Sequence, residues 1–160
     1  MGKLSNTHSS KGPSIVFVRS ANYDCSPAIP RAMEASENIF CHRRILCWNR
    51  YGRDDPEEMV VDGVFVKSFM KTASQRSLKV ILLTLWWQIW LFWELIKIRC
   101  NVIQVFDIQS VIPCSMVAMI TRSRLIYDMR DPFALCYRFS TLVRKIVYAV
   151  DWMVMGISSA

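Results

Sequence analysis

Apolar and polar residues alternate in blocks along the chain, and the blocks have the lengths of strands and helices. Short runs rich in Val, Ile, Leu and Phe predict strands at residues 15–18, 44–48, 102–106 and 125–127. Longer apolar segments predict helices at residues 27–38, 77–99 and 111–120. Apolar strands that alternate with helices predict a mostly parallel sheet, so we expect one doubly wound, Rossmann-like α/β domain.

The remaining segments complete this plan. Residues 59–61 and 64–66 flank Asp62 and Gly63, a pair that favours a tight hairpin or a bend before a strand. Beyond Asp131 the pattern predicts a helix to about residue 149 and then a strand. That last strand is expected at residues 152–158. Residues 1–13 are polar and are expected to form a flexible tail before a single domain at residues 14–160.

Charged residues follow the strands inside residues 101–133, which predict a strand, a turn, a helix and a second strand. Ligands of parallel sheets bind at the carboxyl ends of the strands, and here those ends carry Asp107, Asp128, Arg130 and Asp131. Arg130 could bind an anionic group while the carboxylates orient hydroxyls. Alternatively, Asp107 and Asp131 cap the helices that follow them, and Asp128 pairs with Arg130. Both interpretations remain open.

The most apolar segment is the predicted helix at residues 77–99, whose residues 80–93 carry no charge. This stretch is shorter than the ~20 residues that a membrane-spanning helix needs, so a span is possible but a peripheral position is preferred. At helical spacing the expected core face comprises Ile81, Leu82, Leu85, Ile89, Phe92 and Ile96. A neighbouring face of Trp and Lys residues is typical of a membrane interface, although an ordinary buried helix is equally consistent with the pattern. The membrane-interface candidates are Lys79, Trp86, Trp87, Trp90 and Lys97.

Composition narrows the expected partners. The 160 residues carry a net charge of +7, which favours an anionic partner such as a nucleic acid, a phospholipid or a phosphorylated substrate. The chain contains none of the patterns typical of nucleic-acid binding, so we expect no nucleic-acid partner. The six cysteines form no Cys-x-x-Cys pair and the two histidines lack ligand spacing, so we expect reduced thiols and no metal. A Gly-x-Gly-x-x-Gly motif is also absent, and we expect no bound cofactor.

Two strand ends resemble a known family. Residues 101–107 read NVIQVFD and residues 125–131 read LIYDMRD. They resemble the D-V-I-x-x-H-D and L-V-Y-D-x-H-D strand ends in the amino-terminal domain of GT-B glycosyltransferases of the family 4 type. Residues 45–48, 62–66 and 149–158 are similar to three further strands of that domain, and Asp24 with residues 27–35 is similar to its first loop and helix. The resemblance extends over residues 14–160.

The resemblance implies the acceptor-binding half of a retaining, metal-independent glycosyltransferase at the cytoplasmic face of a membrane. Such an enzyme transfers a sugar from a nucleotide-sugar to a lipid-linked or polysaccharide acceptor. The nucleotide-sugar would bind a second domain, which we expect on a separate donor-binding chain because this chain stops before it. By resemblance the acceptor candidates are Tyr23, Asp24, Asp107, Asp128, Arg130 and Asp131.

Two departures affect the chemistry. The family often has histidine where this chain has Phe106 and Arg130, and phenylalanine neither donates nor accepts a proton. No catalytic residue is therefore predicted. The alternative function is a non-catalytic module, a scaffold or truncated remnant that docks on a membrane or a partner through its Trp-rich helix.

Overall fold

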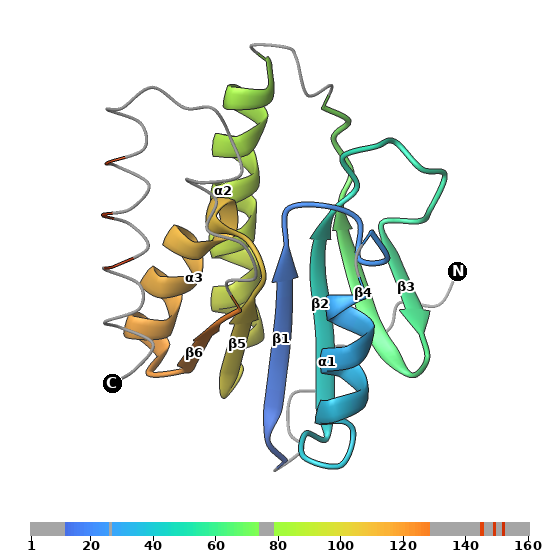
Figure 1. Ribbon diagram of the computed structural model, residues 1–160, viewed down its shortest axis with the longest axis vertical. Coiled ribbons are helices and arrows are strands. Elements are labelled where there is room, and N and C mark those ends of the chain that lie inside the picture. The colour runs from blue at the N-terminus through green and yellow to red at the C-terminus, as the bar shows by residue number, and fades with distance from the viewer. Residues whose placement is uncertain are drawn as a thin grey trace.

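A computed structural model of the protein describes residues 12–25, 27–73 and 79–128, together with the single positions 145, 149 and 152. It contains one six-stranded sheet in the order β3-β4-β2-β1-β5-β6 (Figure 1). The strands are β1 Ser14–Arg19, β2 His42–Trp48, β3 Glu58–Val61, β4 Val64–Phe69, β5 Val102–Val105 and β6 Arg124–Tyr127. The helices are α1 Ala28–Ser36, α2 Lys79–Ile98 and α3 Ile108–Thr121. The pairings are parallel except between β3 and β4, which confirms the predicted Rossmann-like α/β fold.

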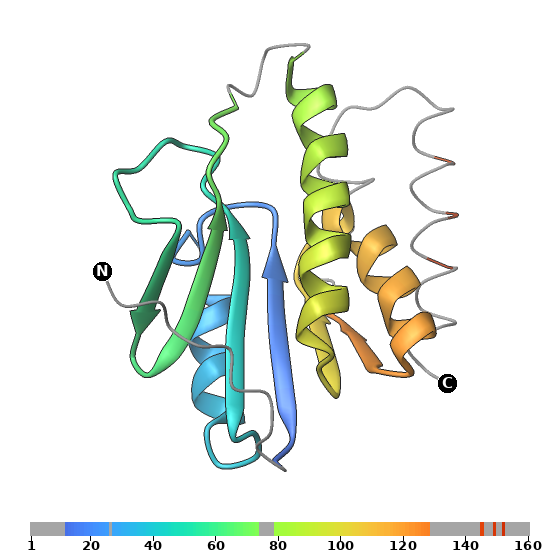
Figure 2. The ribbon, with the colours of Figure 1, turned by 180° about the vertical axis from the view of Figure 1, so that it is seen from behind.

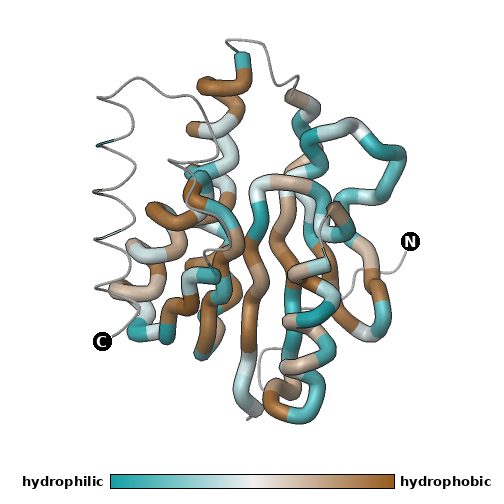
Figure 3. The backbone as a smooth tube through the Cα atoms, viewed as in Figure 1, coloured by the Kyte–Doolittle hydropathy of each residue, from teal (hydrophilic) through white to brown (hydrophobic). Residues whose placement is uncertain are grey.

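The central strand β1 is buried on both faces, so helices must cover both sides of the sheet. Val16 and Val18 face the core under α2 and α3, whereas Ile15 and Phe17 face the core under α1. Figure 2 shows α2 in front of the sheet and α1 behind it. The apolar strands and the apolar stretches of α2 and α3 are brown in Figure 3. The domain is therefore doubly wound, as the sequence predicts.

The segment at Asp62 and Gly63 forms a hairpin between β3 and β4. Both residues have positive φ, 50° and 74°, the backbone geometry of the two-residue turn that matches strand twist. Val61 and Val64 are paired across the turn.

The predicted core face of α2 is wrong. The helix buries Trp87, Leu91 and Leu95 completely, a stripe at a spacing of four residues. Most of the predicted core face is instead exposed, at 62%, 64%, 52% and 55% for Ile81, Leu82, Leu85 and Ile89. Phe92 and Ile96 are partly buried against the core. Because α2 is apolar on nearly every side, its hydropathy pattern does not identify the face that packs on the sheet.

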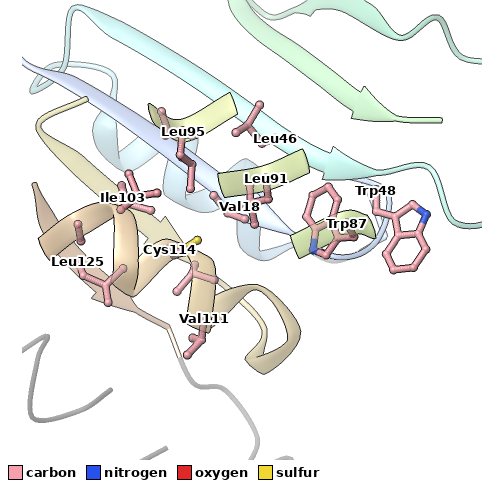
Figure 4. Close-up of a cluster of buried hydrophobic side chains, with 14 of the residues drawn as sticks. Val18, Leu46, Trp48, Trp87, Leu91, Leu95, Ile103, Val111, Cys114 and Leu125 are labelled. Atoms are coloured by element: carbon pink, nitrogen blue, oxygen red, sulfur yellow. The ribbon is translucent and has the colours of Figure 1, made fainter. Parts of the chain in front are cut away.

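Aromatic stacking decides which face packs. The ring of Trp87 stacks on that of Trp48 from β2 at 6.0 Å and on that of Trp90 at 5.3 Å. Phe69 at the end of β4 packs against Trp48, Trp87 and Trp90. Figure 4 shows Trp48 and Trp87 beside each other in the core that also contains Leu91 and Leu95. Trp87 is therefore a core residue and cannot serve at a membrane interface in this fold.

By length and composition α2 could cross a membrane, and 22% of its most apolar window is buried inside the protein. One such helix is weak evidence of a membrane span, because the core helix of a soluble domain passes the same test. Here the buried stripe of α2 is already packed on the sheet.

The chain beyond Asp128 is described only at Lys145, Ala149 and Trp152, which are helical. The predicted helix at residues 131–149 is confirmed at Lys145 and Ala149. The predicted strand at residues 152–158 is wrong at Trp152, where the chain is still helical, and its other residues lie outside the described part. Of the predicted tail, only Gly12 and Pro13 are described.

We expect Leu91→Ala to lower the free energy of unfolding by about 2–5 kcal/mol, because it opens a cavity in a packed core. The matched variant Leu82→Ala deletes the same atoms from a side chain that is 64% exposed, and should change stability by no more than about 0.5 kcal/mol. Urea unfolding of the three proteins measures both values. Equal losses from the two variants would contradict the observed orientation of α2.

Candidate functional site

The carboxyl ends of β2, β1 and β5 lie side by side, because these strands are neighbours and parallel. The loops that leave these ends bring together polar residues far apart in the sequence. They include Asn22 after β1, Asn49 and Arg50 after β2, and Asp107 after β5. This edge is where ligands of doubly wound sheets bind.

Asp107 ties the ends of two strands to the start of α3. Its Oδ2 accepts the backbone N–H of Ser20 at 2.6 Å, and its Oδ1 accepts the N–H and the O–H of Ser110 at 3.0 and 2.8 Å. Removal from water raises the pKa of the Asp107 carboxyl above its ordinary value, while the hydrogen bonds from Ser20 and Ser110 act in the opposite direction. Asp107 is the helix cap that the sequence offered as an alternative.

Tyr23 and Asp24 lie in the loop after β1. The Asp24 carboxylate forms an ion pair with the Arg53 guanidinium from the loop after β2. Burial, and then the Asp24 and Asp55 carboxylates, raise the pKa of the Tyr23 phenol. The phenol is therefore neutral at physiological pH and can exchange hydrogen bonds with a ligand without a change in charge.

The loops after β1 and β2 are further joined through Asn49. Its Oδ1 accepts the Asn22 Nδ2–H at 3.2 Å and the Arg53 backbone N–H at 3.0 Å, and its own Nδ2 donates to the Arg53 carbonyl at 2.7 Å. Asn22 and Asn49 are both 3% exposed. The edge is thus a rigid polar network rather than a pair of loose loops.

Three buried polar atoms at this edge have no hydrogen-bond partner among the described residues, and sequence reasoning missed all three. They are Asn22 Oδ1, Arg50 Nε and Gln109 Oε1, which follow β1, β2 and β5. Leaving such an atom unpaired costs about 1–3 kcal/mol, so a ligand that pairs with it recovers that energy. The guanidinium of Arg50 is also held over the Trp48 ring, 5.4 Å from its centroid. In the sequence, Asn22, Arg50 and Gln109 are marked only by their position shortly after apolar strands.

The structure places four of the six acceptor candidates at the carboxyl edge: Tyr23, Asp24, Asp107 and Asp128. Asp128 follows β6, and its backbone N–H donates to the Val105 carbonyl at 2.9 Å. Arg130 and Asp131 lie outside the described residues. Phe106, where the resembled family has histidine, packs against Phe17 with ring centroids 6.3 Å apart.

The membrane-interface candidates do not form one surface. Trp86 is 64% exposed, whereas Trp87 is fully buried and Trp90 is partly buried. Lys79 is exposed at the first residue of α2, and Lys97 at the other end pairs with Glu94 at 2.9 Å. The apolar residues that α2 and α3 do expose are a different set, which includes Trp93, Ile112 and Met116.

The described residues contain no group of three or more His, Cys, Asp and Glu side chains that could hold a metal ion. The described cysteines are free thiols. Burial raises the pKa of Cys47 and of Cys100 to about 11, and that of Cys114 well above its ordinary value. These buried thiols are therefore protonated near neutral pH and are poor nucleophiles.

Asp107→Asn should lower the free energy of unfolding by about 1–3 kcal/mol, because an amide nitrogen replaces the oxygen that accepts the Ser20 N–H. The raised pKa means that the folded protein binds the Asp107 proton more tightly than the unfolded chain does. Wild-type stability therefore falls relative to the variant as the pH rises from about 4 through the raised pKa. Denaturant titrations of both proteins at pH 4 and pH 7 should show a smaller difference at pH 7, and a larger difference there would contradict this account.

Alkylation with iodoacetamide at pH 8, read by peptide mass mapping, should modify the exposed Cys25 and Cys41 first. The buried and protonated thiols should react at least roughly tenfold more slowly. They are Cys47, Cys100 and Cys114. In denaturant the difference should disappear. Modification of native Cys47 as fast as Cys41 would contradict the burial of β2.

No protein-family model matches the chain, and no curated protein matches it in sequence. Relatives therefore assign neither a family nor an activity to the protein. A Rossmann-like fold hosts many unrelated activities, so function has to be argued from the polar edge and the exposed surfaces.

Proposed function

We propose that this chain binds a sugar-containing acceptor at the carboxyl edge of its sheet and is the acceptor-binding half of a glycosyltransferase. One observation carries the proposal: Asn22 Oδ1, Arg50 Nε and Gln109 Oε1 are buried there without a hydrogen-bond partner in the described part of the chain. They follow three neighbouring parallel strands, which places the three residues at the same edge of the sheet.

The chemistry of these atoms fits a carbohydrate. The Asn22 and Gln109 amide oxygens accept hydrogen bonds and Arg50 Nε–H donates one, while each sugar hydroxyl can do both. The bonds among Asn22, Asn49 and Arg53 hold the loops in place before any ligand binds, which lowers the entropic cost of binding. The ion pair between Asp24 and Arg53 neutralises these two side chains at the edge of the site.

The proposed role is binding rather than turnover by this chain alone. The Asp107 carboxylate already accepts three hydrogen bonds, and phenylalanine at residue 106 offers no proton transfer. Transfer would therefore require a donor-binding domain for the nucleotide-sugar. The resemblance of NVIQVFD and LIYDMRD to family 4 strand ends supports this assignment and, with it, a retaining reaction that needs no metal.

A second candidate function is a non-catalytic docking module. It is favoured by the apolar side chains that α2 and α3 leave exposed, among them Trp86 at 64% and Trp93 at 57%. Exposed apolar surface of this extent commonly marks an interaction site.

Saturation-transfer NMR with glucose, mannose and N-acetylglucosamine, each free and as an alkyl glycoside, tests the first function. At least one probe should give signal with the wild type, and Gln109→Met should weaken its binding by about tenfold, the effect of one hydrogen bond to a buried group. The same variant should keep or raise the free energy of unfolding, because the oxygen it removes accepts no hydrogen bond from any residue that the structure describes.

Gln88→Met on α2 is the matched control and should bind the probe like the wild type. A merely structural role for Gln109 predicts the reverse pattern, with lower stability and unchanged sugar binding. Absence of signal from every probe would also overturn the proposed function.

A further inference from the structure

A groove runs between α2 and α3 on the outer side of the sheet. Both helices start at the carboxyl edge and run to the amino edge, because α2 leads into β5 and α3 connects β5 to β6 (Figure 2). The groove has a volume of about 310 Å³, and its walls include Ile89, Phe92 and Trp93 from α2 with Ile112 and Met116 from α3. With the exception of Gln88 these walls are apolar.

The apolar surface extends well beyond the groove. Outside the groove, Leu85 and Trp86 of α2 are 52% and 64% exposed, and Met119 and Ile120 of α3 are 59% and 62% exposed. Single exposed apolar residues need no explanation, but a continuous surface over two neighbouring helices marks a site of interaction.

A larger, basic pocket lies further along the same two helices, at the amino edge. This pocket has a volume of about 840 Å³ and is lined by Arg99, Arg122 and Arg124. Ile96 and Ile120 line it as well, and they lie four residues beyond Phe92 and Met116 on the same helices. The apolar groove and the arginines therefore form one continuous surface, which we call the α2–α3 surface.

The three arginines are available to a ligand. All three are exposed, and none forms an ion pair with another described residue. The nearby carboxylate of Glu94 is already paired with Lys67 at 3.2 Å and with Lys97 at 2.9 Å. Arg99 and Arg122 follow the carboxyl ends of α2 and α3, where a cation favours the helix dipole. The helix dipole explains a positive charge at each helix end. It does not explain why an apolar groove lies beside three arginines.

We propose that the α2–α3 surface binds the face of an anionic phospholipid bilayer. Ile89, Trp93 and Met116 enter the acyl boundary, and the arginines bind lipid phosphates at the end of the groove. A bilayer supplies hydrocarbon and phosphate together, which matches the two parts of this surface. α2 lies along the membrane rather than across it, since Trp87 and Leu91 remain packed on the sheet.

This site is separate from the proposed sugar site. Asn22 and Gln109 belong to the carboxyl edge, whereas the arginine pocket is at the amino edge. The membrane proposal therefore does not depend on sugar binding, and Gln109→Met should bind vesicles like the wild type.

Vesicle flotation tests the charge requirement. The wild type should float with vesicles of phosphatidylglycerol and phosphatidylcholine, and less with phosphatidylcholine alone or in high salt. A triple variant should bind the anionic vesicles about a hundredfold more weakly, which is about fivefold for each charge removed. Its substitutions are Arg99→Asn, Arg122→Asn and Arg124→Gln. Asparagine is chosen at the first two positions because it tolerates their left-handed backbone, with φ of 48° and 57°. Arg31→Gln on α1 removes an exposed charge elsewhere and should bind normally.

A matched isoleucine pair tests the apolar requirement. Ile89→Ser should weaken vesicle binding by at least about tenfold, because it removes one inserting side chain. Ile39→Ser removes a side chain that is 61% exposed after α1, and should have no effect. Circular dichroism confirms that each variant is folded.

Three results would overturn the proposal: no flotation of the wild type, equal binding to neutral and anionic vesicles, or equal losses from Ile89→Ser and Ile39→Ser. A wild-type dimer in size-exclusion chromatography that Ile89→Ser converts to a monomer would instead assign the surface to a second copy of the chain.

Discussion

The structure depends on how α2 covers the sheet. The central strands are apolar on both faces, so the side opposite α1 must be closed by another helix, and the stacked rings of Trp87 and Trp48 determine how α2 sits there. The same Trp87 donates its Nε1–H to Ser110 Oγ at 3.2 Å, and Ser110 in turn donates to Asp107. One run of contacts thus joins α2, the start of α3 and the ends of β5 and β1.

This placement of α2 links both proposed sites. Through Ser110 and Asp107 it fixes the loop after β1, where the buried amide oxygen of Asn22 has no partner among residues 12–25, 27–73 and 79–128. Because only one stripe of the helix is buried, α2 turns Ile89 and Trp93 outward beside α3. A polar edge that could take a neutral sugar and an apolar, basic surface that could take a lipid bilayer therefore belong to one compact arrangement. A lipid-linked sugar acceptor would make use of both.

Much of the fold could be predicted from sequence, because strands buried on both faces and a positive-φ pair such as Asp62 and Gly63 have strong local signals. The face of α2 could not, because nearly every position of that helix is apolar and the choice is made by stacking on Trp48, a contact between distant residues. The predicted site residues at Asp24 and Asp107 are at the expected edge, but a partner elsewhere in the chain occupies each carboxylate. The unpartnered atoms of Asn22 and Gln109 become visible only once burial is known.

Hydroxyl-radical footprinting tests the orientation of α2 most directly, because it reports the solvent exposure of individual side chains along the helix. Trp86 and Trp87 are neighbours in sequence with the same intrinsic reactivity, yet they are 64% and 0% exposed. From these exposed fractions we expect rapid oxidation of Trp86, Trp93 and Met116, whereas Trp87 should be protected until the protein unfolds. Rapid oxidation of native Trp87 together with protection of Trp93 would contradict this orientation of α2, and it would also contradict the exposure of the α2–α3 surface.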